Sequence, residues 1–159
     1  MQENEVIKIG DDAPDFVLKD QNGTETRIAD QKGKIVLLSF HPLAWTSICA
    51  DQMRSIDENY HRFEEMDAVP FGLSVDSVPC KKAWAAELGI SNLKMLSDFW
   101  SHGGVAHAYG IFRDSDGLSE RANIIVGRDG NVAFVKVYPM NRLPDIGEIL
   151  EIMKKMNEE

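Results

Sequence analysis

The chain has 159 residues, of which 43% are hydrophobic and 27% charged, with 12 Gly, 6 Pro and 2 Cys. This length fits one domain spanning residues 1–159, which buries roughly 70% of the surface that the unfolded chain exposes. The composition excludes a disordered chain, a disulfide-built scaffold and a bilayer-spanning segment. The formal net charge of −9 argues against nucleic acid and anionic membranes as partners.

The first third of the chain predicts a hairpin and then a buried strand. Residues 16–18 and 24–28 flank the turn Asp20-Gln21-Asn22-Gly23, so we expect an N-terminal β-hairpin. The run from Lys34 to Phe40 is largely apolar and contains β-branched residues. Such a run predicts a strand that is buried on both faces.

A second strand and two helices follow. The segment 47–66 carries an apolar stripe at helical spacing and is predicted as one helix. Residues 68–75 predict a buried strand, and residues 76–79 predict a capped helix start with Pro in its opening turn. The second helix then runs over 80–88 and stops at Gly89.

The remaining elements alternate between the two types. Arg128-Asp129-Gly130 is a strong hairpin signal between two strands. The predicted elements are a weak strand at 94–96, a short helix at 102–109, strands at 121–127 and 131–138, and a closing helix at 145–156. This succession predicts an α/β fold with a central mixed β-sheet and helices on both faces.

Both cysteines open a helix that follows a buried strand. Right-handed crossovers make those strands neighbours, and sites form at the carboxyl edge of such sheets. We therefore expect Cys49 and Cys80 at one edge of the sheet.

The surroundings of Cys49 favour a reactive thiol. A helix N-terminus stabilises a thiolate and lowers a cysteine pKa. Thr46 can reach the sulfur or cap the helix, and Pro42 stiffens the loop. A buried cysteine can equally be a small apolar core residue, and these residues alone leave that alternative open for both thiols.

Metal binding and dithiol exchange have little support in the sequence. The four histidines form no ligand spacing with the cysteines, and no CxxC motif is present.

The acidic start Met1-Gln2-Glu3-Asn4-Glu5 lacks the features of a signal peptide. We therefore predict the reducing cytoplasm as the compartment, where a thiol is free, catalytic or transiently oxidised.

The loop before the first helix carries a family motif. Residues 42–49, Pro-Leu-Ala-Trp-Thr-Ser-Ile-Cys, match the PxxxTxxC active-site motif of the peroxiredoxins. Further segments that resemble this family in order are residues 10–18, 74–77, 96–100, 109–112 and 121–126. The resemblance covers about residues 6–155 and is greatest to the branch named after alkyl hydroperoxide reductase E, usually a one-cysteine branch.

This resemblance implies a thioredoxin-like fold and a thiol peroxidase that acts on hydrogen peroxide or organic hydroperoxides. By motif, Cys49 is the peroxidatic nucleophile, which becomes a sulfenic acid. Arg121 matches the active-site arginine, which would hold the anionic sulfur and polarise the peroxide. Thr46 would hydrogen-bond the sulfur or the peroxide, and Pro42 would shield the sulfur from water.

The sequence departs from the family pattern at two positions. Many members have Glu three residues after the nucleophile, where this chain has Gln52. The second departure is Cys80, because the most similar branch usually has no thiol there, whereas Q-type peroxiredoxins place a resolving cysteine in this helix. We therefore predict Cys80 as the resolving cysteine, with a one-cysteine enzyme resolved by an external thiol as the alternative.

The resemblance also implies partners. We expect no cofactor, and a thioredoxin-like, glutaredoxin-like or low-molecular-weight thiol as reductant. A homodimer is expected, with Trp45 and Trp84 as candidates for exposed aromatic residues at its interface. The rival hypothesis is a thioredoxin-fold binding or chaperone module whose cysteines do not turn over.

Overall fold

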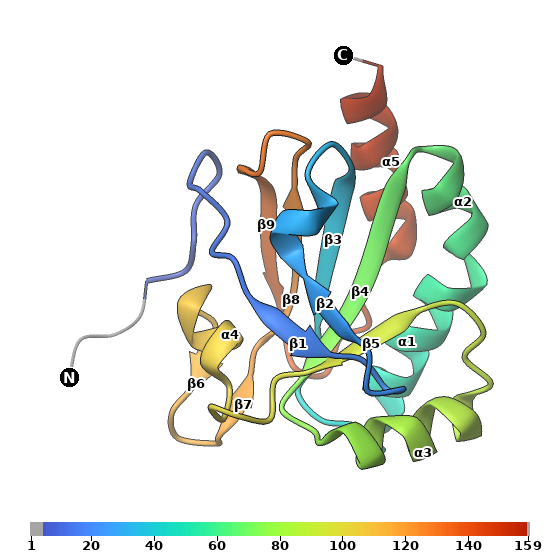
Figure 1. The fold of residues 1–159 in the computed structure, drawn as a ribbon, viewed down its shortest axis with the longest axis vertical. Coiled ribbons are helices and arrows are strands. Elements are labelled where there is room, and N and C mark those ends of the chain that lie inside the picture. The colour runs from blue at the N-terminus through green and yellow to red at the C-terminus, as the bar shows by residue number, and fades with distance from the viewer. Residues whose placement is uncertain (1–4, 159) are drawn as a thin grey trace.

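A mixed β-sheet of seven strands forms the centre of the computed structural model, which describes residues 5–158 (Figure 1). The strand order is β2-β1-β5-β4-β3-β8-β9. The three central parallel strands are β3 (Ile35–Phe40), β4 (Ala68–Ser74) and β5 (Lys94–Ser97). The antiparallel strands at the two sides are β1 (Val17–Lys19), β2 (Glu25–Arg27), β8 (Arg121–Val126) and β9 (Val132–Tyr138).

Strand β3 forms where the apolar run predicts it. All six of its residues are buried, because the strand has a neighbour on each side and helices or loops over both faces. It pairs in parallel with β4, in the register that sets Leu38 opposite Phe71. The chain between the two strands crosses over one face of the sheet, as a parallel connection requires.

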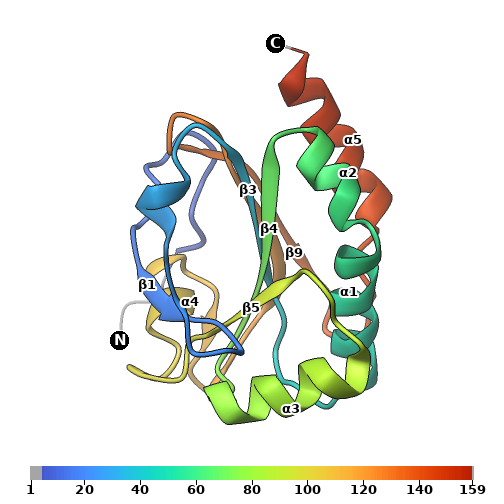
Figure 2. The ribbon, with the colours of Figure 1, turned by 45° about the vertical axis from the view of Figure 1, so that its right-hand side comes forward.

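Four helices cover that face, and smaller elements cover the other (Figure 2). The four helices are α1 (Ser47–Glu58), α2 (Tyr60–Glu65), α3 (Val78–Leu88) and α5 (Ile146–Asn157). The opposite face carries the β1–β2 hairpin, the 3₁₀ turn η1 (Ile28–Gln31) and α4 (Gly104–Ala108). This arrangement confirms the predicted α/β class, the thioredoxin-like fold and the N-terminal hairpin.

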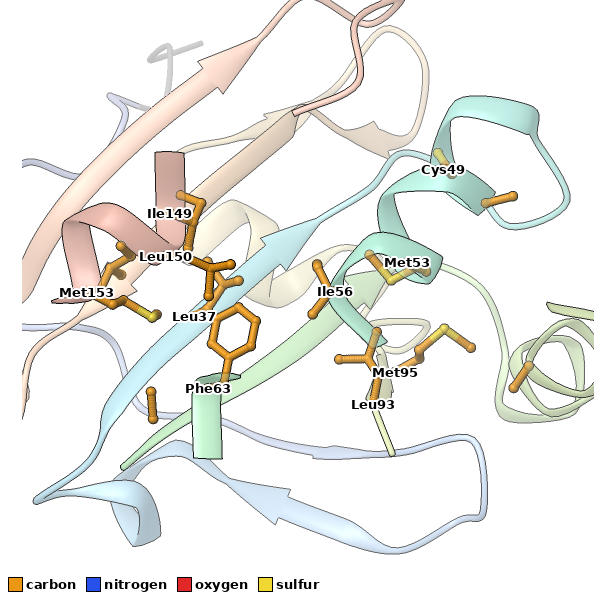
Figure 3. Packing of buried hydrophobic residues seen from close by; sticks show 14 of the residues in the cluster. Leu37, Cys49, Met53, Ile56, Phe63, Leu93, Met95, Ile149, Leu150 and Met153 are labelled. Atoms are coloured by element: carbon orange, nitrogen blue, oxygen red, sulfur yellow. The ribbon is translucent and has the colours of Figure 1, made fainter. Parts of the chain in front are cut away.

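The core on the four-helix face holds Cys49 against the sheet (Figure 3). The inward residues Met53, Ile56 and Phe63 continue from Cys49 along α1 and α2, and all are fully or nearly fully buried. They pack with Leu37 of β3 in one apolar cluster. Burial of each large apolar side chain contributes about 1.5–3 kcal/mol, so this stripe fixes the position of the helix that carries Cys49.

The predicted helix over 47–66 is wrong in one respect, because two helices fill that range. Asn59 has φ −100° and ψ 10°, and it ends α1 and begins α2. Its side-chain amide donates to the Ser55 carbonyl at 2.7 Å, a local bond that competes with helix continuation. The apolar stripe continues across the break, which is why the spacing alone suggested one helix.

Smaller differences lie elsewhere. The predicted helix over 102–109 is limited to α4, and the strands β6 (Phe112–Arg113) and β7 (Leu118–Ser119) form an unpredicted two-stranded sheet. Trp84 is 1% exposed, so the expectation of an exposed indole there is wrong. Trp84 instead fills the space between α3 and the sheet, with its ring 5.3 Å from the ring of His41.

The N-terminal residues on which the signal-peptide argument depends, 1–4, lie outside the described residues. Between residues 5 and 158, none of the helices is both long enough and apolar enough to cross a membrane.

Candidate active site

Cys49 occupies the first turn of α1, where the chain leaves the carboxyl end of β3. The helix begins at Ser47 with Thr46 as its N-cap, so Cys49 is its third residue. Its side chain is fully buried, and the residue is a free thiol. The unpaired N–H groups and the partial positive charge of the helix start therefore lie next to the sulfur.

Arg121 supplies a full positive charge to the same sulfur. Because β8 runs antiparallel to β3, its first residue lies at the carboxyl end of β3. One terminal nitrogen of the guanidinium, Nη1, donates to Cys49 Sγ at 3.3 Å. The other side of the group donates to the Met140 carbonyl, from Nη2 at 2.9 Å and from Nε at 3.3 Å.

The side chain of Gln52 also holds the Arg121 guanidinium, at the same nitrogen that contacts the sulfur. It is 1% exposed, and its Oε1 accepts from Arg121 Nη1 at 2.8 Å. Its Nε2 donates to Ser39 Oγ at 2.7 Å and to the Phe40 carbonyl at 3.2 Å. The Gln52 amide therefore links Arg121 to β3, and it does so with N–H donors that a carboxylate at this position would lack.

The positive charge of Arg121 is not neutralised by a neighbouring carboxylate. Within residues 5–158, no Asp or Glu forms an ion pair with it, and its acceptors are a carbonyl, an amide oxygen and a sulfur. Arg121 is only 4% exposed, so solvent screens its charge little. An anionic sulfur is therefore the natural counter-charge for this guanidinium.

A row of hydrogen bonds extends from Gln52 along the four-helix face, across β3, β8 and β9, to α5. Each member donates to the next, and the row ends at a carboxylate on the first turn of the helix. The successive bonds are Gln52 Nε2 to Ser39 Oγ, Ser39 Oγ to Asn123 Oδ1, Asn123 Nδ2 to Tyr138 Oη, and Tyr138 Oη to Glu148 Oε1. We refer to this set, with Arg121 at its head, as the polar row.

Two other predicted site residues lie in the loop before Cys49. Pro42 is buried close to the end of β3. Thr46 is exposed, and its hydroxyl donates to the Leu43 carbonyl at 2.7 Å, while its oxygen accepts no bond from a backbone N–H of α1. This bond holds the hydroxyl within the loop, three residues before Cys49.

Cys80 lies at the same edge of the sheet but contacts another partner. It is the third residue of α3, and its N–H donates to Ser77 Oγ at 3.3 Å. Its thiol donates to Asp76 Oδ1 at 3.8 Å. Burial raises the pKa of Cys80, and the negative charge of Asp76 raises it further. Cys49 belongs to the apolar cluster on this face and the partly buried Cys80 packs against it, and neither forms a disulfide.

Two buried polar side chains adjoin these thiols. Lys81 is fully buried, and burial lowers its pKa from 10.5 to about 8. Burial, with the charges of Lys81 and Arg121, holds the pKa of His41 well below its usual range. In the described part of the chain, neither Lys81 Nζ nor the ring nitrogens of His41 have a hydrogen-bond partner.

Sequence reasoning missed most of the supporting residues. Ser39 and Asn123 are polar positions within buried strands, a signal that the alternation pattern alone could have raised. Asp76 was interpreted as part of a helix start, and the Met140 carbonyl carries no side-chain signal at all. Over residues 5–158, no group of three or more His, Cys, Asp or Glu side chains is placed to hold a metal ion.

Known proteins resemble this chain, in which a buried thiol and an arginine meet on a thioredoxin-like sheet. Residues 9–135 match the model of the AhpC/TSA family. Alkyl hydroperoxide reductase E of Mycobacterium tuberculosis is 37% identical over 133 residues, which cover 83% of this chain and 86% of that protein. Peroxiredoxin-1 of Gekko japonicus is 28% identical over 156 residues, covering 92% and 77%.

Solved structures agree with these relatives. A 2-Cys peroxiredoxin of Plasmodium vivax in its reduced form has a TM-score of 0.84 and 28% identity, covering 94% of this chain and 82% of that one. Peroxidoxin BcpB from Mycobacterium tuberculosis has a TM-score of 0.82 and 27% identity, covering 94% and 97%.

The fold, the buried thiol and the similarity to these relatives together place the chain in the class of thiol peroxidases. The chain belongs to the AhpC/TSA family, the peroxiredoxins, and is similar to its alkyl hydroperoxide reductase E-like branch. It is a thiol-dependent peroxidase, whose substrate is a peroxide and whose electrons come from a thiol reductant.

Proposed function

We propose that Cys49 is the peroxidatic cysteine and that Arg121 is the group that activates both the sulfur and the peroxide. The observation that carries this proposal is the 3.3 Å contact between Arg121 Nη1 and Cys49 Sγ, in a guanidinium without a carboxylate partner among the described residues. Thiolate is the nucleophilic form of cysteine. The buried guanidinium is aimed at the sulfur and is the counter-charge with which that form would pair.

The proposed reaction is attack of the Cys49 thiolate on one oxygen of the hydroperoxide. The S–O bond forms as the O–O bond breaks, and the departing oxygen takes a proton and leaves as water or an alcohol. Cys49 becomes a sulfenic acid, and the peroxide is reduced. Directed N–H groups of Arg121 stabilise the negative charge that develops on the departing oxygen.

Pro42 and Thr46 are proposed as supporting residues of this step. Buried Pro42 offers no N–H and keeps the loop under the sulfur free of water. Exposed Thr46 stands at the entrance of the Cys49 turn, where its hydroxyl oxygen is available to an incoming peroxide.

Cys80 is proposed as the resolving cysteine, which converts the sulfenic acid into an intramolecular disulfide. Both helices that carry the thiols begin at the carboxyl ends of paired parallel strands, which supports this assignment. A disulfide requires Cα atoms within about 7 Å, so the first turn of α1 unwinds in this step. Resolution by an external thiol is the second candidate, favoured by the present contact of Cys80 with Asp76.

The proposal extends to assembly and compartment. We propose a single-domain cytoplasmic enzyme that forms a homodimer and is recycled by a thioredoxin-like, glutaredoxin-like or low-molecular-weight thiol. Trp45 is 55% exposed in the Cys49 loop, and Trp100, after β5, is 83% exposed. Such indoles favour burial in a protein interface. Sedimentation equilibrium of the Trp100→Glu variant beside the wild type tests the dimer.

Intact mass after one equivalent of hydrogen peroxide tests the chemistry. The wild-type protein is expected to lose two hydrogens, while Cys80→Ser gains one oxygen and Cys49→Ser stays unchanged on the same timescale. An added oxygen in both the wild type and Cys80→Ser would replace the internal disulfide by an external resolving thiol. Absence of any rapid change in the wild type would contradict the peroxidatic role of Cys49 and favour a binding module.

A further inference from the structure

The carboxylate of Asp76 lies between the two segments that carry the thiols. Asp76 stands in the short connection between β4 and α3. Its Oδ2 accepts the Ala44 N–H at 2.8 Å and the Ser74 hydroxyl at 2.7 Å. Its Oδ1 accepts the Cys80 thiol at 3.8 Å. One side chain thus holds the loop that precedes Cys49 and, at the same time, the thiol of Cys80.

We propose that Asp76 is a positioning residue that keeps Cys80 a neutral thiol and the Cys49 loop closed, and so delays formation of the disulfide. The proposal rests on the resolving role proposed for Cys80. Asp76 would then determine how long the Cys49 sulfenic acid persists before it is resolved.

Charge explains how the thiol is kept neutral. The groups that face Cys80 are Asp76 from the connection after β4, Lys81 from α3 and the indole of Trp45 from the Cys49 loop. Burial raises the pKa of Cys80 most, and Asp76 adds to this rise, while the Trp45 hydrogen bond and the Lys81 charge oppose it. The balance favours the thiol, which reacts neither with peroxide nor with a sulfenic acid.

Geometry explains how the loop is held. Cys49 is fully buried in the first turn of α1, so its sulfur reaches Cys80 only when that turn unwinds. The Ala44 N–H bond fixes the loop just before this turn. A hydrogen bond to a charged acceptor is stronger than one to a neutral acceptor, so its loss shifts the loop toward the open state.

The delayed step is a balanced exchange of one bond for another. Cys80 releases its proton to solvent, and its thiolate attacks the sulfur of the Cys49 sulfenic acid. The S–S bond forms as the S–O bond breaks, and the hydroxide takes a proton and leaves as water. Cys80 is oxidised, and the sulfur of Cys49 is reduced from the sulfenic to the disulfide level.

The first test measures the thiol without any catalysis. In a Cys49→Ser background, the pKa of Cys80 is read from the pH dependence of its alkylation. Asp76→Asn removes the charge and keeps an amide oxygen for the Ala44 N–H, so we expect the pKa of Cys80 to fall. Asp76→Ser is the second variant in case the amide does not fold, and it predicts the same direction.

The matched control is Asp57→Asn. Asp57 also joins a helix to a loop, because its carboxylate accepts the N–H groups of Ser91, Asn92 and Leu93, but it lies at the far end of α1. This variant is expected to leave the pKa of Cys80 unchanged. A pKa of Cys80 that is equal or higher in the Asp76 variants would overturn the proposal.

The second test follows disulfide formation by rapid quenching and mass analysis in the chain with both cysteines. Each unit by which the pKa of Cys80 falls raises the thiolate fraction tenfold at pH below the pKa, and nucleophilicity falls by about threefold. We expect Asp76→Asn to resolve its sulfenic acid about threefold faster per pKa unit. Slower resolution would contradict a restraining role of Asp76.

The two proposals fail separately. If Cys80→Ser recycles like the wild type, the resolving role is lost, yet the titration in Cys49→Ser still reports on the effect of Asp76 on its neighbour. If Cys80 resolves but its pKa does not respond to Asp76, only the present inference is lost.

Discussion

At the scale of single residues, Gln52 determines how much of the positive charge of Arg121 reaches Cys49. The neutral amide orients the guanidinium without neutralising it. Gln52→Glu would add a carboxylate beside the guanidinium, and it would also remove the donors to Ser39 and to the Phe40 carbonyl. We expect slower oxidation of Cys49, by on the order of tenfold, equivalent to about 1.4 kcal/mol in the barrier.

The measurement is the second-order rate constant of Cys49 with hydrogen peroxide. Gln21→Glu is the matched control, because Gln21 is also a buried amide that both donates and accepts, with the Leu93 carbonyl and the Met95 N–H as its partners. Both variants should be less stable than the wild type, and only Gln52→Glu should react more slowly with hydrogen peroxide. An unchanged or faster rate in Gln52→Glu would disprove the role assigned to the neutral amide.

From the sequence, the proximity of Cys49 and Arg121 could be predicted only through the family motif. Cys49 and Arg121 are 72 positions apart, and their contact depends on the antiparallel pairing of β8 with β3. No periodicity fixes that pairing. The double contact of Asp76 is likewise invisible in the sequence, because it forms where the Cys49 loop and α3 meet in space.

At the scale of elements, the N-terminal segment is packed against the turn after α4. Gly110 has φ +73°, and a Cβ there would lie 1.9 Å from the Glu5 carbonyl oxygen. Gly110→Ala is therefore expected to displace this segment and to lower the free energy of unfolding by about 1–3 kcal/mol.

Urea denaturation checks this value, with Gly104→Ala as the control. Gly104 begins α4, and a Cβ there meets nothing closer than 3.8 Å. Alanine in this helix should stabilise the protein by about 0.5–1 kcal/mol. Equal effects of the two substitutions would refute the packing argument.

The elements themselves were predictable where the local pattern is strong. The hairpin, β3, β4 and α5 lie within two or three residues of their predicted ranges, because apolar runs and turn residues determine them locally. The strands β6 and β7 have two residues each, too few to show an alternation. The break at Asn59 depends on one side-chain bond inside a continuous apolar stripe.

At the scale of the whole molecule, Lys81 links stability to pH. Its pKa is lowered from 10.5 to about 8 on folding, so the unfolded chain binds more protons between these values. The contribution of Lys81 to the free energy of unfolding therefore rises as pH increases from about 8 to 10.5, and this gain is lost as pH falls back toward 8. At 1.36 kcal/mol per unit, the change amounts to about 3 kcal/mol.

Lys81→Met removes this dependence and keeps most of the side-chain volume. The variant should be more stable than the wild type at pH 7.5, and the difference should shrink as pH rises to 10.5. Urea unfolding of both proteins across this range provides the comparison, with exposed Lys82→Met as the control. A difference that stays constant with pH would show that Lys81 is not a destabilising buried charge.

The polar row has a consequence for proton order. Each of its hydroxyl and amide groups donates in one direction only, away from Arg121 and toward Glu148, so rotating one group forces its neighbours to rotate as well. The row thus has two self-consistent proton arrangements. Only one turns an oxygen of Gln52 toward the guanidinium, and the cation at one end and the anion at the other both select it. The orientation of a buried amide beside the reactive sulfur is thereby determined in part by a carboxylate on another helix of the same face, three strands away.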